Sequence, residues 1–504
     1  MNIALFLQMA AEACPDRPAL SHDGKHYTYS QLFSAAKRAA RHFSAANCKF
    51  VCLLDTSSPA TPIALMGAAI AGIPYVPLNY RLSEEQTAPL LDRISPAYLI
   101  SGPRNETYDF NGWVVQDSAD FLNDVLNGEE VEVTWHEDPS AVAVQLFTSG
   151  TTGIPKAALL RHEHLVSYIL GSVEFMGALE EEAALVSVPP YHIAGISAAM
   201  SNIYACRRVV QLADFDAAEW LRLVAEEGVT SAFVVPTMLT RIIREIDTTK
   251  LDPKMFASLL SIAYGGGKMP VPVIKRALKL FPDVNFTNAY GLTETSSTIA
   301  LLGPEDHRTA IDHDDNAVHA RLGSVGKPLP SLEIEVRDED GKQLEPFEPG
   351  EIYVRGPQVS GEYNGRSVLD SEGWFPTRDT GYLDDHGYLF LSGRADDVIV
   401  RGGENISPGE IEDLLHQHSA IADTAAVGIT SEEWGEVVAL TVVIATGQSI
   451  TKDEIRSHIR EHLRSSRVPE TILFSSELPY NETGKLLRRV VREWFKDEQD
   501  QSAS

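Results

Sequence analysis

Short apolar runs alternate with amphipathic segments along most of the chain. The runs predict buried strands, whereas segments with an apolar residue every three or four positions predict helices. The predicted strands are Phe50–Leu54, Tyr75–Pro77, Ala97–Ile100, Leu185–Val188, Arg208–Leu212, Ser231–Val235 and Leu260–Tyr264. The predicted helices are Tyr29–Ala45, Ala217–Glu227 and Val271–Leu280. This alternation predicts an α/β fold with layered, largely parallel sheets.

The pattern changes after Gly323, where short strands separated by turns predict a β-rich subdomain. These strands are Leu332–Arg337, Gly350–Val354 and Tyr388–Leu391. A second α/β unit follows, with predicted helices Pro408–His416 and Thr451–Arg464 and predicted strands Ile421–Gly428 and Val437–Ile444. We place the domain boundary at Asp396, which gives a large domain of residues 1–395 and a small C-terminal domain of residues 396–504.

Two uncharged stretches are long enough to suggest membrane spans, Thr56–Tyr80 and Ala183–Cys206. Both contain prolines, which interrupt a spanning helix. Each is therefore predicted to be a short helix plus a buried strand in a globular core. The N-terminal segment contains the acidic residues Glu12 and Asp16 and lacks the basic n-region of a signal peptide, so we do not expect a signal peptide.

The amino-acid composition limits which molecules can be binding partners of this protein. The chain has 504 residues, 42 Lys and Arg against 71 Asp and Glu, and a net charge of −29. Such a field repels nucleic acids and anionic membranes, so neither is expected as a partner. Four cysteines, Cys14, Cys48, Cys52 and Cys206, lack metal-ligand spacing and are predicted to be reduced thiols of a cytoplasmic enzyme.

The segment Thr148–Lys156 is the most informative motif. It holds four hydroxyl side chains, two glycines and a lysine in nine residues. Glycines let a backbone turn closely around an anion, hydroxyls donate hydrogen bonds, and Lys156 adds a positive charge. The spacing differs from the Walker pattern. The segment therefore predicts a phosphate-binding loop of another kind.

Further motifs follow this loop: Tyr290-Gly291-Leu292-Thr293-Glu294, Gly373-Trp374-Phe375 with Asp379, Gly393-Arg394-Ala395-Asp396-Asp397, Gly402-Gly403-Glu404-Asn405-Ile406 and Gly484-Lys485. In order and spacing, the set resembles the adenylate-forming (ANL) superfamily of acyl-CoA synthetases, adenylation domains and firefly-type luciferases. The resemblance covers nearly all of the chain. It implies a large N-terminal domain and a small mobile C-terminal α/β domain.

The resemblance also implies an ATP site. Its expected residues are Thr148, Ser149, Gly150, Thr151, Thr152, Gly153, Lys156, Gly265, Gly266, Gly267, Asn288, Ala289, Tyr290, Gly291, Asp379 and Arg394. In this family pattern Tyr290 stacks on adenine, Asp379 accepts the ribose hydroxyls, and Arg394 contacts ribose or phosphate. Thr293 donates to the α-phosphate, and Glu294 is the expected ligand of Mg²⁺.

One departure affects the ribose site. Relatives usually have Thr-Gly-Asp where this chain has Thr377-Arg378-Asp379. Arg378 is bulkier than glycine and is expected to reshape the local turn, although the assignment of Asp379 to ribose stands.

The resemblance also implies a carboxylic acid substrate, and two residues are expected to act on it. Lys485, near the end of the chain, matches the lysine that bridges the substrate carboxylate and the α-phosphate in the transition state. His192, in Pro189-Pro190-Tyr191-His192-Ile193-Ala194-Gly195, resembles the residue that closes the acyl pocket until ATP binds. The alternative for His192 is a structural histidine.

The resemblance assigns other residues to a later step, in which the acyl group is transferred to CoA. Asp396 matches the hinge about which the small domain rotates, and Gly402 and Gly403 match the loop that lines the tunnel for the CoA thiol. Trp434 resembles a CoA contact, with surface packing as an equal alternative, and Arg81 is a candidate for a CoA phosphate.

The resemblance implies an ATP-dependent acid–CoA ligase that forms an acyl-adenylate and then transfers the acyl group to CoA. The main rival is a stand-alone adenylation enzyme that loads an acid onto a carrier protein. A luciferase-like oxygenase and a non-catalytic nucleotide-binding protein are weaker rivals. A homodimer is compatible with the sequence.

The acid pocket is expected between Tyr191–Ser197, Phe233–Met238, Tyr264–Gly267 and Asn288–Thr298. Small residues at Ser296, Ser297 and Thr298 favour a medium-chain, aromatic or alicyclic acid over acetate, with a place in fatty acid metabolism.

Overall fold

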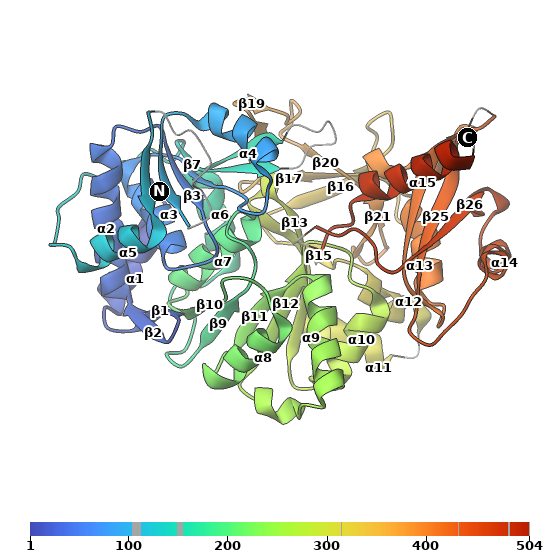
Figure 1. Cartoon of the computed structure of the whole chain (residues 1–504), viewed down its shortest axis with the longest axis horizontal. Helices are drawn as coiled ribbons and strands as arrows, with labels where there is room; N and C mark the ends of the chain where they lie inside the picture. The colour runs from blue at the N-terminus through green and yellow to red at the C-terminus, as the bar shows by residue number, and fades with distance from the viewer. Residues whose placement is uncertain (103–111, 149–154, 314, 432, 482–483, 503–504) are drawn as a thin grey trace.

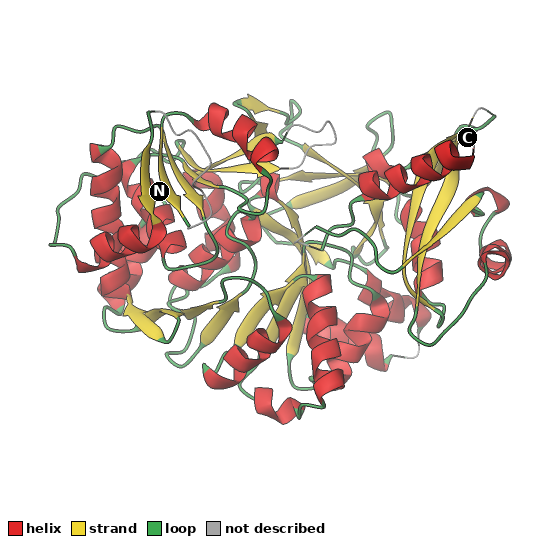
Figure 2. Ribbon diagram, in the orientation of Figure 1, coloured by secondary structure: helices red, strands yellow, loops and turns green. Residues whose placement is uncertain are grey.

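A computed structural model describes residues 1–102, 112–148, 155–313, 315–431, 433–481 and 484–502. Figure 1 shows a large N-terminal part, coloured blue to yellow, with a smaller orange and red C-terminal part beside it. Figure 2 shows that sheets and helices are layered in both parts. The predicted α/β class is confirmed.

The first sheet has nine strands over the described residues, in the order β15-β14-β13-β12-β11-β9-β10-β1-β2. Its strands are β1 (Pro18–His22), β2 (Lys25–Thr28), β9 (Ala183–Val186), β10 (Arg208–Gln211), β11 (Ser231–Val234), β12 (Ser261–Gly265), β13 (Asn285–Leu292), β14 (Ser297–Leu302) and β15 (Lys327–Pro328). The pairings from β1 through β10, β9, β11 and β12 to β13 are parallel. Helices α8 (Ala217–Glu226), α9 (Pro236–Thr249) and α10 (Val271–Leu280) supply apolar residues to the core beside these strands.

The second sheet has eight strands over the described residues, in the order β19-β18-β8-β7-β4-β3-β5-β6. Its strands are β3 (Phe50–Leu54), β4 (Tyr75–Pro77), β5 (Ala97–Ser101), β6 (Val114–Asp117), β7 (Val142–Thr148), β8 (Lys156–Arg161), β18 (Glu362–Tyr363) and β19 (Arg366–Ser367). The helices of this region are α1 (Leu5–Ala13), α2 (Tyr29–Ala45), α3 (Ala60–Ala71), α4 (Glu84–Leu91), α5 (Ser118–Asn127), α6 (His162–Ser172) and α7 (Ile193–Tyr204). The start of α2 is fixed by a capping box, in which Thr28 and Gln31 satisfy each other's backbone N–H groups.

The predicted β-rich subdomain is a four-stranded antiparallel sheet in the order β16-β17-β20-β21. Its strands are β16 (Glu333–Arg337), β17 (Gly350–Arg355), β20 (Phe375–Leu383) and β21 (Leu389–Arg394). Two helices, α11 (Pro304–Asp312) and α12 (Asn316–Ala320), precede it. Ile352, Val354 and Phe375 pack with Tyr290 and Ile299, so this sheet shares a core with the end of the nine-stranded sheet.

The C-terminal part contains β22 (Ile399–Arg401), β23 (Glu404–Ile406), β24 (Ile421–Ser431), β25 (Gly435–Ile444) and β26 (Thr471–Ser475). Its helices are α13 (Pro408–His416), α14 (Lys452–His462) and α15 (Arg488–Ser502). The long β24–β25 hairpin forms its centre, with β26 parallel to β25. Apolar residues cover both faces of this sheet, so the unit has its own core.

The two uncharged stretches fold as predicted. Thr56–Tyr80 contains α3 and β4, and Ala183–Cys206 contains β9 and α7. Among the described residues, no helix is long and apolar enough to cross a membrane.

This topology gathers the sequence motifs. The phosphate-loop segment follows β7, the Gly265-Gly266-Gly267 segment begins at the end of β12, and Glu294 follows β13. Because β12 and β13 are parallel neighbours, their carboxyl ends lie at one edge of the sheet. This is where open α/β sheets bind ligands.

Candidate active site

Asp379 is at the centre of a buried polar cluster. Its Oδ2 accepts a hydrogen bond from the Tyr290 hydroxyl at 2.5 Å, and its Oδ1 pairs with Arg394 Nη1 at 2.9 Å. Thr377 Oγ1 accepts from the Asp379 backbone N–H at 3.1 Å. Strands β20 and β21 supply this arrangement, because Asp379 and Arg394 are direct partners across them. These contacts therefore hold the Asp379 carboxylate in a fixed orientation.

The cluster is electrostatically coupled. Burial raises the pKa of Tyr290 far above its usual value, and the Asp379 carboxylate raises it further. Tyr290 therefore stays a neutral donor. Burial alone would lower the pKa of Arg394, but the charge of Asp379 outweighs it and the net shift is upward. The Tyr290 ring packs in an apolar cluster, which fixes the position from which its hydroxyl orients the carboxylate.

Arg378 adopts a backbone conformation that favours glycine. Its φ is +61°, in the left-handed region, where a side chain costs roughly 1–2 kcal/mol. Its side chain is exposed and lies 3.8 Å from Glu351. Arg378 therefore adopts a conformation that glycine takes up without strain, and Asp379 pairs with Arg394 across β20 and β21.

The glycines after β12 allow backbones to approach closely. A Cβ on Gly265 would lie 2.2 Å from the carbonyl oxygen of Ala289 on β13. Gly266 has a φ of +80°, and a Cβ on Gly267 would lie 3.3 Å from the Gly484 carbonyl oxygen. This segment therefore meets both the neighbouring strand and the loop that carries Lys485.

The neighbouring strand β13 is equally crowded. A Cβ on Gly291 would lie 1.8 Å from the carbonyl oxygen of Ser297, so no larger residue fits there. Asn288 is buried, and its amide donates to the Ser324 carbonyl at 3.1 Å.

Glu294 is buried in the η3 turn (Thr293–Thr295), which also places half-buried Thr293 directly after β13. Its carboxylate accepts a short hydrogen bond from the hydroxyl of Tyr363, and its backbone carbonyl accepts from Ser360 N at 2.8 Å. The Lys156 ammonium lies 5.5 Å from the centre of the same Tyr363 ring. An anionic oxygen and a cation thus flank one tyrosine, which fits a magnesium-bound polyphosphate.

Tyr363 was not predicted from the sequence. It lies in β18, which pairs with β8 at Tyr363 and Ala158 and so extends the second sheet. Burial raises its pKa, and so does the Glu294 charge, which keeps the hydroxyl protonated as a donor.

Of the predicted phosphate loop, Ser149, Gly150, Thr151, Thr152 and Gly153 lie outside the described residues. The flanking Thr148 and Lys156 are paired across β7 and β8.

Arg93 holds both flanks of that loop and was also missed. Its guanidinium lies 5.0 Å from the Phe147 ring centre and donates to the Pro155 carbonyl at 2.6 Å. It also donates to Asn364 Oδ1 at 2.6 Å, which ties the loop base to the strand pair that carries Tyr363.

Lys485 reaches this site from the C-terminal domain. The preceding Gly484 has a φ of +71°, and a Cβ on it would lie 2.9 Å from Thr237 Oγ1 at the start of α9. The lysine side chain still reaches solvent, yet the surrounding protein desolvates it enough to lower its pKa. The charge of Arg394 lowers that pKa further, whereas Asp379 and Glu294 oppose the shift. Lys485 is thus brought to the predicted nucleotide site.

The predicted acid pocket is bounded by α7 and β14. His192 is the N-cap of α7, with its ring centre 4.6 Å from that of Tyr191. Ser297 and Ser197 join the two elements through their hydroxyls at 3.2 Å. Two of the predicted walls therefore meet.

The predicted CoA residues fall into two groups. Gly402 and Gly403 form a turn with φ of +56° and +82°, and a Cβ on Gly402 would lie 2.8 Å from the Trp434 ring. Trp434 is 41% exposed, and its ring centre lies 4.7 Å from the Arg401 guanidinium. Packing against this turn accounts for one face of the ring.

Arg81 lies in a different setting. It pairs with Asp214 at 2.6 Å and lines a cavity of about 670 Å³ together with residues 476–481 of the C-terminal domain. The predicted hinge, Asp396, lies in the η5 turn (Ala395–Asp397) between β21 and β22. The adjacent Asp397 pairs with Arg488 at 3.5 Å and with Arg492 at 3.3 Å.

Together, these groups can orient a ribose, neutralise a polyphosphate and place an ammonium beside the site of bond formation. Such a site on this two-part fold defines an enzyme that activates carboxylic acids with ATP. The family description "AMP-binding enzyme" matches residues 7–364, and "AMP-binding enzyme C-terminal domain" matches residues 410–485. The chain belongs to the AMP-binding enzyme family.

Curated relatives match over nearly the whole chain. A 2-succinylbenzoate–CoA ligase of Bacillus cereus is 31% identical over 497 residues, which covers 97% of this chain and 98% of the relative. The enzyme of the same name from Bacillus subtilis (strain 168) is 30% identical over 501 residues, 98% of each chain.

Solved structures agree. The o-succinylbenzoate CoA synthetase of Bacillus subtilis with its acyl-adenylate intermediate has a TM-score of 0.82 at 29% identity, covering 97% of both chains. The same enzyme with ATP and magnesium ion has a TM-score of 0.83 at 29% identity, covering 96% of this chain and 98% of that one.

The predicted reaction class is confirmed: the chain is an AMP-forming acid–CoA ligase, with ATP and CoA as its co-substrates and Mg²⁺ as its cofactor. The expectation of fatty acid metabolism is not supported, because the acid in the names of these relatives is 2-succinylbenzoate.

Proposed function

We propose that this ligase activates an aromatic carboxylic acid of the 2-succinylbenzoate type. The observation that carries the proposal is the similarity over nearly the full length of the chain to ligases named for that acid. The small hydroxyl side chains of Ser197 and Ser297, between α7 and β14, leave more room than bulky residues would. The start of α7 carries the partial positive charge of a helix N-terminus, which suits an acid with a second carboxylate.

In the proposed first half-reaction, an oxygen of the acid attacks the α-phosphorus of ATP and pyrophosphate leaves. Asp379 accepts the ribose hydroxyls while Tyr290 and Arg394 hold its carboxylate in place. Lys156 and the phosphate loop neutralise the outer phosphates, and Lys485 stabilises charge that develops between the acid and the α-phosphate. Mg²⁺, when bound at Glu294, neutralises phosphate charge.

In the proposed second half-reaction, the small domain of residues 396–504 rotates about Asp396. The CoA thiolate then attacks the acyl carbon, and AMP leaves with the bonding electron pair. The Gly402-Gly403 turn lines the thiol path, and Arg81 contacts a CoA phosphate. His192 is proposed to close the acid pocket before ATP binds.

CoA-dependent AMP release from a panel of free acids tests the substrate. 2-Succinylbenzoate is expected to give the highest kcat/KM, benzoate a lower value, and octanoate and acetate the lowest. A preference for octanoate would overturn the proposal. Ser197→Leu should raise the KM for the acid and leave the KM for ATP unchanged, because it fills the pocket and not the nucleotide site.

A carrier protein is the rival acceptor, and replacing CoA with a phosphopantetheinylated carrier in the same assay separates the two.

We also propose a cytoplasmic location, supported by four cysteines that form no disulfide.

A further inference from the structure

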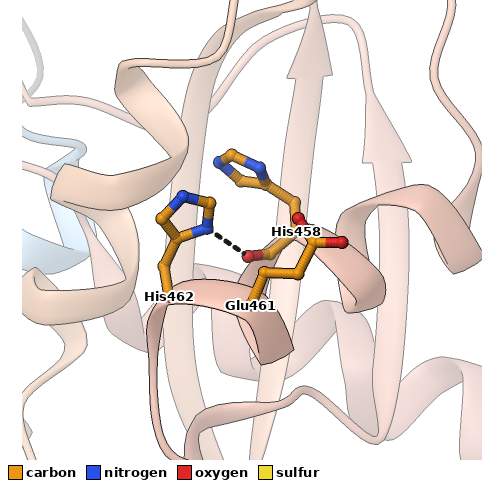
Figure 3. A group of neighbouring side chains, drawn as sticks. All are labelled: His458, Glu461 and His462. Carbon is orange, nitrogen blue, oxygen red and sulfur yellow. Dashed lines mark hydrogen bonds between the residues drawn. The ribbon is translucent and has the colours of Figure 1, made fainter.

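Histidines gather on the C-terminal domain, away from the residues of the nucleotide site. His458 and His462 lie in the last turns of α14, with Glu461 between them (Figure 3). His418, just after α13, packs edge-on against His458 with ring centres 5.1 Å apart. In Figure 1, α14 lies at the outer edge of the C-terminal domain.

The spacing places three ligand groups on one helix face. Residues three and four positions apart are neighbours on a helix, so His458, Glu461 and His462 converge. One nitrogen or carboxylate oxygen of each lies within 4.8 Å of the others. Donor atoms around a tetrahedral zinc ion are about 3.3–3.5 Å apart. Rotation of the exposed side chains of Glu461 and His462 can close that gap.

Hydrogen bonds leave donor atoms available. His462 Nδ1 lies 2.8 Å from the His458 carbonyl, which can only accept, so Nδ1 carries the proton and Nε2 carries a lone pair (Figure 3). A backbone carbonyl orients many metal-binding histidines in this way. His458 Nε2 is buried and has no hydrogen-bond partner among the described residues. A buried polar atom without a partner is costly, and a bound cation would satisfy it.

His418 packs against His458 but is not one of the three proposed ligands. His418 itself is occupied otherwise, because its Nδ1 accepts from the Ala420 backbone N–H at 3.2 Å. It therefore supports the His458 ring and is not counted as a ligand.

We propose that His458, Glu461 and His462 form a binding site for a borderline divalent transition-metal cation such as Zn²⁺. Two imidazoles and a carboxylate are ligands that zinc accepts, with water completing its coordination. The sequence His-x-x-Glu-His also brings two histidines to zinc on the helix of one class of metallopeptidases. Mg²⁺ is a poor occupant because it prefers oxygen ligands. The site is independent of the adenylation chemistry, and its cation fixes the end of α14.

Metal titration of the full-length protein tests this site. The protein is freed of metal with a chelator and titrated with Zn²⁺ alone, without ATP or Mg²⁺, in a calorimeter. Wild type is expected to bind one equivalent, and His462→Ala to weaken that binding by about tenfold or more, since even supporting groups of metal sites cost this much. Zn²⁺ should also raise the thermal midpoint of wild type more than that of His462→Ala.

Controls separate this site from scattered binding. His386→Ala removes an exposed histidine in the turn between β20 and β21 and should bind Zn²⁺ like wild type. Glu461→Gln keeps the shape of an exposed side chain and should also weaken Zn²⁺ binding. It therefore tests the site even if His462→Ala does not fold. Absence of binding by wild type, unchanged affinity in both cluster variants, or an equal loss in His386→Ala would each overturn the proposal.

Discussion

The region around Asp379, which we propose to bind ribose, and the loop of Lys485 differ in how they are held. Asp379 is fixed within the large domain by Tyr290, Arg394 and Thr377. Lys485 reaches the same place from the small domain, where its backbone N–H donates to Asn481 Oδ1 at 2.8 Å and the preceding glycine packs against Thr237. One region is preorganised, and the other is delivered by docking of a domain.

One contact between the two domains is an exposed ion pair. Lys268 pairs with Asp413 at 2.5 Å, but both side chains are about half exposed, and such pairs contribute little. A contact of this kind can break and re-form at little cost in free energy. This contrast supports the proposal that the large domain keeps its nucleotide site while the small domain exchanges Lys485 for the Gly402-Gly403 turn.

Lys485→Ala should have the largest effect, because it removes the delivered charge. We expect the rate of adenylate formation to fall roughly 10²–10³-fold, the cost of losing one stabilising group for developing charge. Thioester formation from preformed acyl-adenylate and CoA should largely survive. Pyrophosphate release and CoA-dependent AMP release measure the two steps. Lys452→Ala, an exposed lysine at the start of α14, is the control, and equal loss of both steps would contradict the assigned role.

Asp396→Pro tests whether the small domain rotates about this residue. Proline fixes φ near about −65°, which is compatible with the 3₁₀ turn observed here, so the present orientation should be retained. Adenylate should still form, whereas transfer to CoA should slow by about tenfold or more, equivalent to a barrier raised by about 1.4 kcal/mol. Asp396→Ala leaves φ free and should transfer normally. Normal overall turnover in the proline variant would argue against rotation at this residue.

Local signals explain which parts could be predicted from the sequence. The bounds of α2, β3, β4, α10 and α13 match their predicted ranges, because caps, prolines and uninterrupted apolar runs mark them. Asp379, Glu294 and Lys485 could be assigned to the predicted site because they lie in motifs with fixed neighbours.

Residues that act across long sequence distances gave no such signal. Tyr363 reaches Glu294 from 69 positions away, and Arg93 reaches Asn364 from 271 positions away. Their roles depend on strand pairing that no local pattern encodes. The histidines of α14 gave no signal for a related reason, because the contact between the rings of His458 and His418 depends on how α14 packs against the segment after α13.

Tyr363→Phe sharpens the description of the preorganised region. It removes the hydroxyl that orients the Glu294 carboxylate and leaves the ring beside Lys156. A hydrogen bond to a charged group contributes about 1.5–3 kcal/mol, so we expect kcat/KM for ATP to fall by about tenfold or more. The Mg²⁺ concentration for half-maximal activity should rise. Tyr353→Phe, on β17, serves as the control, and a variant with unchanged Mg²⁺ dependence would remove Tyr363 from the site.

Arg378→Gly should have the smallest effect and asks whether the preorganised region stores backbone strain. At a φ of +61° a non-glycine residue costs about 1 kcal/mol or more, whereas the exposed contact with Glu351 at 3.8 Å contributes about 0–1 kcal/mol. Glycine also loses more conformational freedom on folding, about 0.4–1 kcal/mol, which offsets part of the gain. The net rise in the thermal midpoint should therefore be at most about 2–4 °C, with the KM for ATP unchanged. Arg378→Ala removes the same contact but keeps the unfavourable φ, so it should be no more stable than wild type. If the alanine and glycine variants are equally stabilised, the long side chain and not the backbone conformation is the source of the cost.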